Sequence, residues 1–290
     1  MKKRYVPWFL PFCGAAAMAA AMVLAAAAVL SCAGGPSPVS GGPGPVSGGG
    51  QTIPGSGEGL FTLYSRRESI PGGGVSANLR FTLVDAARSG ALQRTVRKLF
   101  YRGRSPEAYV QGFTADWNRE YRRAAAEWTG TPASGAWEYE EAQYVTLASP
   151  FAVIHRNVSV YQGGAHPNWH EDAYILDLAS SRRLLLKDVI APEALPRLRA
   201  LTDRELRRFS QLRTGRALPE GAPFSAGIYL EDEIPPSEDF YPDRNGLNFQ
   251  WDPYEIAPYV VGGVEVNIRW KELADLLSPR GKALAAAFTR

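Results

Sequence analysis

The three histidines of the chain are the side chains whose spacing most directly suggests chemistry. His155, His166 and His170 occupy one short stretch, in which His166 and His170 stand at i, i+4 and two acids follow. Two neutral imidazoles at this spacing converge on one face of a helix, where they can bind zinc. A zinc-dependent cell-wall hydrolase or deacetylase that uses His166 and His170 is therefore one alternative for this protein.

The residues around the histidine pair favour a different structure. Gly163 and Gly164 precede His166, and Pro167 lies between the two histidines, so a helix is disfavoured. We expect instead a rigid loop between two strands that presents imidazole and indole groups at the surface. This interpretation predicts no metal site.

A second concentration of charged side chains lies nearer the C-terminus and is acidic. It consists of Glu231, Asp232, Glu233, Glu238, Asp239 and Asp243, with prolines and aromatic residues among them. A local negative field of this kind steers a cationic protein towards the surface or binds a hard cation. A solvated loop without a ligand is the other interpretation.

Sequence motifs for nucleophilic catalysis are absent. The chain has no Gly-x-Ser-x-Gly elbow and no phosphate-binding glycine-rich loop between a strand and a helix. Carboxylates are plentiful, but a glycosidase needs two of them at a separation that the sequence does not fix. We expect no catalytic residues and no cofactor, and hence no enzyme.

Periodic apolar residues predict the elements that position these groups. Alternation predicts strands at 61–65, 78–85, 137–147, 151–162, 172–178, 184–189, 224–230, 246–251 and 264–268. Spacings of three and four predict helices at 91–100, 105–128, 191–213 and 270–277. The second helix has an inner aromatic stripe, Tyr109, Phe113, Trp117 and Tyr121, which we interpret as core.

The order of these elements indicates the fold class. Strands and helices come in clusters, without the strict alternation of parallel βαβ units. We expect an α+β fold in which antiparallel sheets pack with amphipathic helices. A division into two subdomains, an N-terminal part at 60–150 and a C-terminal part at 151–290, stays open.

The N-terminal segment predicts export and lipid attachment. A short basic stub precedes an uncharged apolar run, and Val29-Leu30-Ser31-Cys32 is similar to a lipobox, the site of signal cleavage and lipidation. We expect a signal peptide at 1–31, a lipid anchor on Cys32 and a flexible Gly/Pro/Ser-rich tether at 32–59. An uncleaved membrane anchor is the alternative. The expected location is the cell envelope, at the outer membrane or facing the periplasm.

The charge and the cysteine content argue against nucleic acid as a partner and against sites that need a thiol. The formal net charge of +3 is carried by Lys2, Lys3 and Arg4, so the chain after Cys32 is formally neutral. We therefore expect no nucleic acid as a partner, because that would need a net basic surface. The cysteines are Cys13 and Cys32, so the globular part has no thiol for a disulfide or a cysteine–metal site.

Three segments resemble a bacterial extracellular domain family. Tyr161 to Pro167 resembles the family's Tyr-x-Gly-Gly-Ala-His motif, and residues 177–190 and 247–268 are similar to two further family patterns. That domain occurs in the lysozyme-sensing anti-sigma factor RsiV and beside the catalytic domain of the peptidoglycan deacetylase PdaC. The resemblance implies a binding module for a cell-wall-related partner, either a lysozyme-type muramidase or peptidoglycan. An anti-sigma role is not expected, because it would require a cytoplasmic domain ahead of the apolar run.

This implied function suggests which residues make the contact. We expect a protruding loop to supply Tyr161, Gly163, Gly164, His166 and Trp169, with aromatic groups as the central anchors. The acidic loop, through Glu231, Asp232 and Glu233, is expected to be a second contact that steers a cationic partner.

Overall fold

The computed structural model describes residues 51–52, 59–71, 76–127, 137–163 and 165–290. The expected signal peptide, Cys32, nearly all of the expected tether and Gly164 lie outside the described residues. Among the helices that are described, none is both long and apolar enough to cross a membrane.

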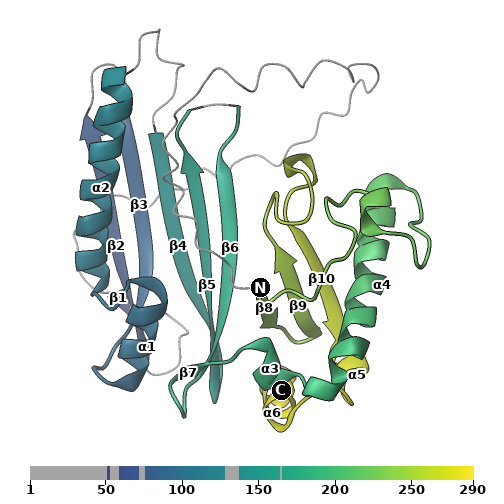
Figure 1. Ribbon diagram of the computed structural model, residues 1–290. Helices are drawn as coiled ribbons and strands as arrows, with labels where there is room; N and C mark the ends of the chain where they lie inside the picture. The colour runs from purple at the N-terminus through teal and green to yellow at the C-terminus, as the bar shows by residue number, and fades with distance from the viewer. Residues whose placement is uncertain (1–50, 53–58, 72–75, 128–136, 164) are drawn as a thin grey trace, which may run out of the picture. The chain divides into compact units, whose positions relative to one another are not determined.

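The largest element is a seven-stranded sheet with its strands in sequence order (Figure 1). Its strands are β1 (Gln51–Thr52), β2 (Phe61–Pro71), β3 (Ser76–Ala86), β4 (Trp137–Ala148), β5 (Phe151–Tyr161), β6 (Asn168–Asp177) and β7 (Arg182–Arg183). Neighbouring strands are antiparallel except β3 and β4, which are parallel. The parallel pair needs a long crossover, and two helices supply it.

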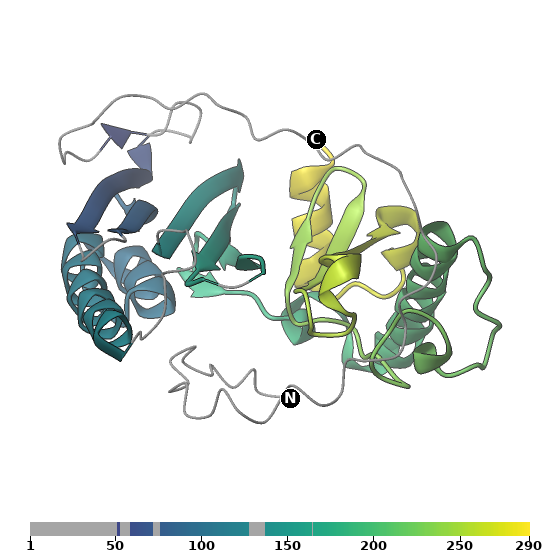
Figure 2. The same ribbon diagram turned by 90° about the horizontal axis from the view of Figure 1, so that it is seen from above.

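The crossover helices cover one face of this sheet (Figure 2). They are α1 (Ala91–Phe100) and α2 (Pro106–Glu127), both at the positions that the apolar spacing predicts. Tyr109, Trp117 and Tyr121 of the predicted stripe are buried, and Phe113 packs against the ring of Tyr139 on β4 at 4.3 Å. The aromatic stripe is therefore core, as expected.

The C-terminal part contains a smaller antiparallel sheet of three strands in the order β10-β9-β8. Its strands are β8 (Phe240–Pro242), β9 (Gly246–Trp251) and β10 (Val264–Arg269). Helix α4 (Leu195–Thr214) packs against β10, and the short helices are α3 (Leu186–Val189), α5 (Trp270–Leu273) and α6 (Pro279–Phe288). Two sheets with helices packed on them give the α+β class that the sequence predicts.

Strands β5 and β6 take part in two hydrophobic cores. Ala152 and Ile154 face the core under α1 and α2, whereas Phe151 and Val153 face a second core that contains the small sheet and α4. Consecutive side chains of a strand point to opposite faces, so one strand serves both cores. The expected boundary at residues 150 and 151 falls in the turn of the β4–β5 hairpin, whose strands pair along their whole length.

Several predicted elements of the C-terminal part are wrong. Residues 184–189, expected as a strand, contain helix α3, because the Asp188 carboxylate accepts the backbone N–H of Leu185 at 2.8 Å and starts a helical turn. Residues 224–230 form a short 3₁₀ helix, Phe224–Ala226, between Pro223 and Gly227. These six- and seven-residue segments are short apolar runs, for which periodicity does not separate strand from helix.

The last helix was also misplaced. The predicted helix at 270–277 ends early, as α5, and α6 follows it. Ser278 caps the N-terminus of helix α6: its hydroxyl accepts the N–H of Gly281 at 3.0 Å, and Pro279 follows in the first turn. This N-cap followed by proline is a helix-start signal in the sequence.

Candidate binding surface

The loop between β5 and β6 meets a segment that is some ninety residues later in the chain. The imidazole of His166 stacks on the ring of Tyr259, with centroids 3.7 Å apart and planes at 15°. The Tyr259 hydroxyl donates a hydrogen bond to the carbonyl oxygen of Pro167 at 2.7 Å. The ring of Tyr254, whose side chain is 54% exposed, lies 5.6 Å from that of Tyr259. His166 and Pro167 therefore form one surface with Tyr254 and Tyr259, which we call the aromatic surface.

Trp169 fixes the next contact between the two segments. A Cβ atom added to Gly263 would lie 2.7 Å from Cη2 of the Trp169 indole, closer than real Cβ contacts allow. The indole therefore packs directly on the backbone of Gly263, and any larger residue there would push it away. Trp169 is half-buried on β6, so it is part of the aromatic surface without protruding as the sequence suggested.

Side chains in and beside the small sheet bind the edge of β6 that faces away from β5, ahead of its short pairing with β7. The carboxylate of Asp252 accepts the N–H of Glu171 at 2.9 Å, and that of buried Asp239 accepts the N–H of Ala173 at 2.9 Å. The amide of Gln250 donates to the carbonyl oxygen of Glu171 at 3.2 Å. These side chains form hydrogen bonds with backbone groups of Glu171 and Ala173. At an unpaired strand edge, those backbone groups could instead pair with another strand.

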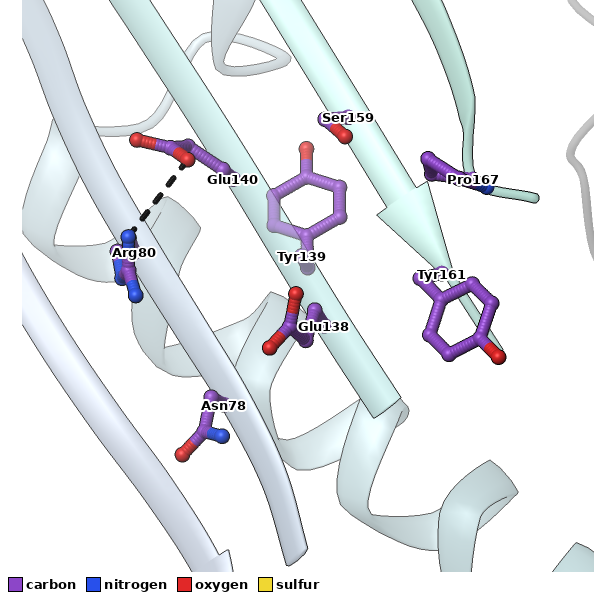
Figure 3. Close-up of a pocket in the computed structure, with 8 residues that line it drawn as sticks. All are labelled: Asn78, Arg80, Glu138, Tyr139, Glu140, Ser159, Tyr161 and Pro167. Atoms are coloured by element: carbon purple, nitrogen blue, oxygen red, sulfur yellow. Dashed lines mark ion pairs between the residues drawn. The ribbon is translucent and has the colours of Figure 1, made fainter. Parts of the chain in front are cut away.

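Two hollows lie beside the aromatic surface. The first, of about 320 Å³, is lined by residues of β3, β4 and β5, namely Asn78, Arg80, Glu138, Tyr139, Glu140, Ser159 and Tyr161 (Figure 3). The second, of about 110 Å³, is lined by Trp169, Glu171, Gln250, Asp252, Gly263 and Glu265. Pro167 joins the first lining and Trp169 the second, so the loop between β5 and β6 borders both.

Further along the same face, His155 is enclosed by aromatic rings. Its imidazole stacks on Tyr144 at 4.5 Å and meets the edge of Tyr241 at 4.9 Å. Burial lowers the pKa of His155 from 6.5 to about 4, so the ring is neutral at ordinary pH. Its neutral form packs as an aromatic group and carries no charge towards a ligand.

Glu171 and Glu265 form an acidic pair next to this aromatic group. Burial, together with the nearby charge of Glu265, raises the pKa of the Glu171 carboxyl. The Tyr241 hydroxyl donates to Glu265 at 2.6 Å, and its own pKa is raised well above the usual range by burial and by that hydrogen bond. The second hollow therefore carries negative charge on its rim.

The acidic loop is tied to other parts of the C-terminal half. Glu233 pairs with Arg199 of α4 at 2.7 Å, and Asp232 accepts a hydrogen bond from Ser225. Glu231 is exposed. The described contacts of Asp232 and Glu233 are thus with α4 and the 3₁₀ helix, while the partner of the histidine loop is the 252–263 segment.

The two histidines of the zinc alternative contact different segments. His166 stacks on Tyr259, whereas the Nε2 atom of His170 lies 3.3 Å from the guanidinium of Arg156 and 3.5 Å from Asp172. A guanidinium at that nitrogen opposes a metal cation there. Among the described residues, no group of three or more His, Cys, Asp or Glu side chains could hold a metal ion. The geometry gives the zinc alternative no support.

Comparison with known proteins finds one family whose pattern part of this chain matches. Residues 187–271 match the family described as "Protein of unknown function (DUF3298)". They contain α4, the small sheet and the whole 252–263 segment, while the histidine loop lies outside the match. No curated protein matches.

Two solved structures have a similar fold. A DUF3298 family member from Bacteroides fragilis is 22% identical with a TM-score of 0.64, and the match covers 78% of this chain and 97% of that one. A DUF3298 family protein from Pseudomonas aeruginosa is 17% identical with a TM-score of 0.54, over 76% of this chain and 94% of that one. Residues 187–271 are therefore similar to the DUF3298 family, and the chain shares the fold of two structures from that family.

Proposed function

We propose that this protein is an extracytoplasmic lipoprotein that binds a cell-wall-related partner without catalysis. One observation supports it most. The two segments that resemble the RsiV-type domain, far apart in sequence, meet in the stacking of His166 on Tyr259 and in the Tyr259–Pro167 hydrogen bond. Exposed aromatic rings held by a fixed scaffold are the usual anchors of a protein interface.

The favoured partner is a cationic muramidase of the lysozyme type. Carboxylates surround the aromatic surface, namely Glu171, Asp252, Glu255 and Glu265. They would steer a cationic protein and orient it at the rim, while Tyr254 and His166 supply apolar contact area. The resemblance to the RsiV-type domain supports the same choice. In this proposal the acidic loop makes no direct contact with the partner and contributes only a steering charge.

Retention on immobilised hen lysozyme tests this function. The full-length chain in detergent should bind saturably, and Tyr254→Ala and His166→Ala should each weaken binding, by about 30-fold for a contact worth ~2 kcal/mol. Leu212→Ala is the matched control, because Leu212 is 76% exposed on α4, outside the aromatic surface. Absence of saturable binding, or equal loss in the control, would contradict the muramidase proposal.

Attachment to the envelope is tested separately. The chain should incorporate a labelled fatty acid in its native host, and Cys32→Ala should abolish the label. A label that persists in this variant would contradict lipidation at Cys32.

Peptidoglycan is the second candidate ligand, and the first hollow favours it. In this version, purified sacculi would sediment the protein in the absence of any muramidase. Loss of sedimentation after Tyr161→Ala, with lysozyme retention unchanged, would assign the glycan to the hollow and the muramidase to the aromatic surface.

A further inference from the structure

The first hollow is built from side chains that strand pairing aligns in rows. In the register of β3, β4 and β5, Asn78 is opposite Glu138 and Glu138 is opposite Tyr161. The next row contains Arg80, Glu140 and Ser159, and Ser159 is in turn opposite Trp169 of β6. Because β-strands alternate, these residues lie on the face away from Leu79 and Phe81, which are buried under α2.

The row residues combine donors and acceptors. Asn78 and Ser159 each offer both, Arg80 only donates, and the carboxylates only accept. The Arg80 guanidinium lies 3.9 Å from the Glu140 carboxylate, and both side chains are more than half exposed. Donor and acceptor groups thus lie side by side and can both bind a ligand group that donates and accepts. Separating the exposed Arg80–Glu140 ion pair to admit a ligand costs little free energy.

An apolar border completes the hollow. Tyr161 at the end of β5 and Pro167 beyond the turn lie at one end of the lining (Figure 3). An aromatic ring presents a flat apolar face and, in tyrosine, a hydroxyl. The volume of about 320 Å³ is at the lower end of the range for small-molecule sites, about 300–1,000 Å³.

We propose that this hollow binds one uncharged pyranose unit of a glycan chain. A pyranose has hydroxyl groups that both donate and accept, as the row residues require, and an apolar C–H face that fits against Tyr161. The inference rests on the proposed cell-wall function and names its ligand class, a neutral amino-sugar polymer.

Other ligand classes fit the lining less well. Glu138 and Glu140 repel a phosphate or another anion. The charged and amide groups would lose water without replacement if an apolar ligand entered. A cationic side chain would be attracted by the carboxylates, but it would also meet Arg80 and has no flat apolar face to place against Tyr161.

Calorimetric titration with tri-N-acetylchitotriose tests the site directly. The full-length chain in detergent should bind this trimer. Glu140→Ala and Tyr161→Ala should each weaken it by about tenfold or more, as expected for loss of a hydrogen bond to a charged group or of a stacking ring. Glu220→Ala, which removes an exposed carboxylate on a distant loop, should bind like the wild type.

The outcomes separate this inference from the function on which it rests. Absence of trimer binding, or equal affinity of all three variants, would overturn the pyranose site. Nα-acetyl-lysine amide serves as a probe with a cationic side chain. Its binding at the hollow in place of the trimer would also overturn the pyranose site. Lysozyme retention that survives either result would leave the proposed binding function standing, whereas loss of both retention and trimer binding would remove the two together.

Discussion

The two faces of β4 and β5 use the same residue types for opposite purposes. On the face under α2, the carboxylate of Glu141 is fully buried and accepts hydrogen bonds from Tyr109, Tyr139, Gln143 and Arg156 at 2.7 to 3.0 Å. On the open face, the neighbouring Glu140 is exposed and has Arg80 at 3.9 Å.

The difference follows from the cost of removing a charge from water. Burial alone would raise the pKa of Glu141, but Arg156 and the tyrosine hydroxyls outweigh it and hold the pKa below its ordinary value. Every acceptor position of Glu141 is therefore committed to the fold. Glu140 stays hydrated and can exchange its bound water for a ligand. We therefore expect ligand binding on the open face, while the residues under the helices stabilise the fold.

Arg156→Met is the strongest test of this contrast between buried Glu141 and exposed Glu140. The substitution leaves the buried Glu141 carboxylate without its cation, and we expect a loss of ~3–5 kcal/mol in the free energy of unfolding, measured in urea. Adding Glu141→Gln removes the stranded charge and keeps an oxygen for both tyrosine hydroxyls, so the double variant should recover part of the loss. A single variant that loses less than ~1 kcal/mol would show that the pair is not structural.

A smaller effect is expected from His155→Phe on the open face. The unfolded chain protonates this histidine near pH 6.5 and the folded chain only near pH 4, so acid favours unfolding. Wild-type stability should therefore fall, by up to ~3 kcal/mol from this group, between these two pH values, and His155→Phe should remove that part of the fall. Unfolding free energies at pH 7 and pH 4.5 measure it.

The exposed histidine provides the control for that measurement. His166→Phe leaves the His155 imidazole in place and should keep the wild-type slope of stability against pH. Equal slopes for wild type and His155→Phe would contradict the assignment of the acid sensitivity to His155.

The smallest expected effect is that of Glu140→Ala on stability. An exposed pair at 3.9 Å contributes little, so the free energy of unfolding should change by less than ~0.5 kcal/mol. Urea unfolding at pH 7 measures it beside the trimer titration. A stability loss above ~1 kcal/mol would mean that the open face is structural too, and the contrast with Arg156→Met would fail.

Local signals in the sequence predicted the structure best. The aromatic stripe of α2 has helical spacing, and the strands β4 and β5 are rich in Tyr, Val and Ile, so the helix and both strands were predicted correctly. The strand predictions for 184–189 and 224–230 were wrong. The structure of the first segment depends on a side-chain cap, and that of the second on the flanking Pro223 and Gly227.

The candidate site was predicted only in part. His166 stacks on Tyr259, Trp169 packs on Gly263 and Tyr161 lines the first hollow. The acidic loop instead contacts α4, and Asp239 within it is buried as an acceptor for β6. Apart from Tyr161, the residues that line the first hollow were missed. Their signal was present, since polar Asn78 and Arg80 alternate with buried Leu79 and Phe81, but alternation does not show which strands will be neighbours.

The sequence by itself determined the periodic elements, the α+β class, the absence of thiols from the globular part and the segments that resemble a known domain. Only the tertiary structure decided that His166 meets Tyr259, that Glu141 is buried while Glu140 is exposed, and which strand aligns with which. The physical reason is range. Periodicity and capping act over a few residues, whereas burial and contact depend on strand register and on packing between segments far apart in the chain.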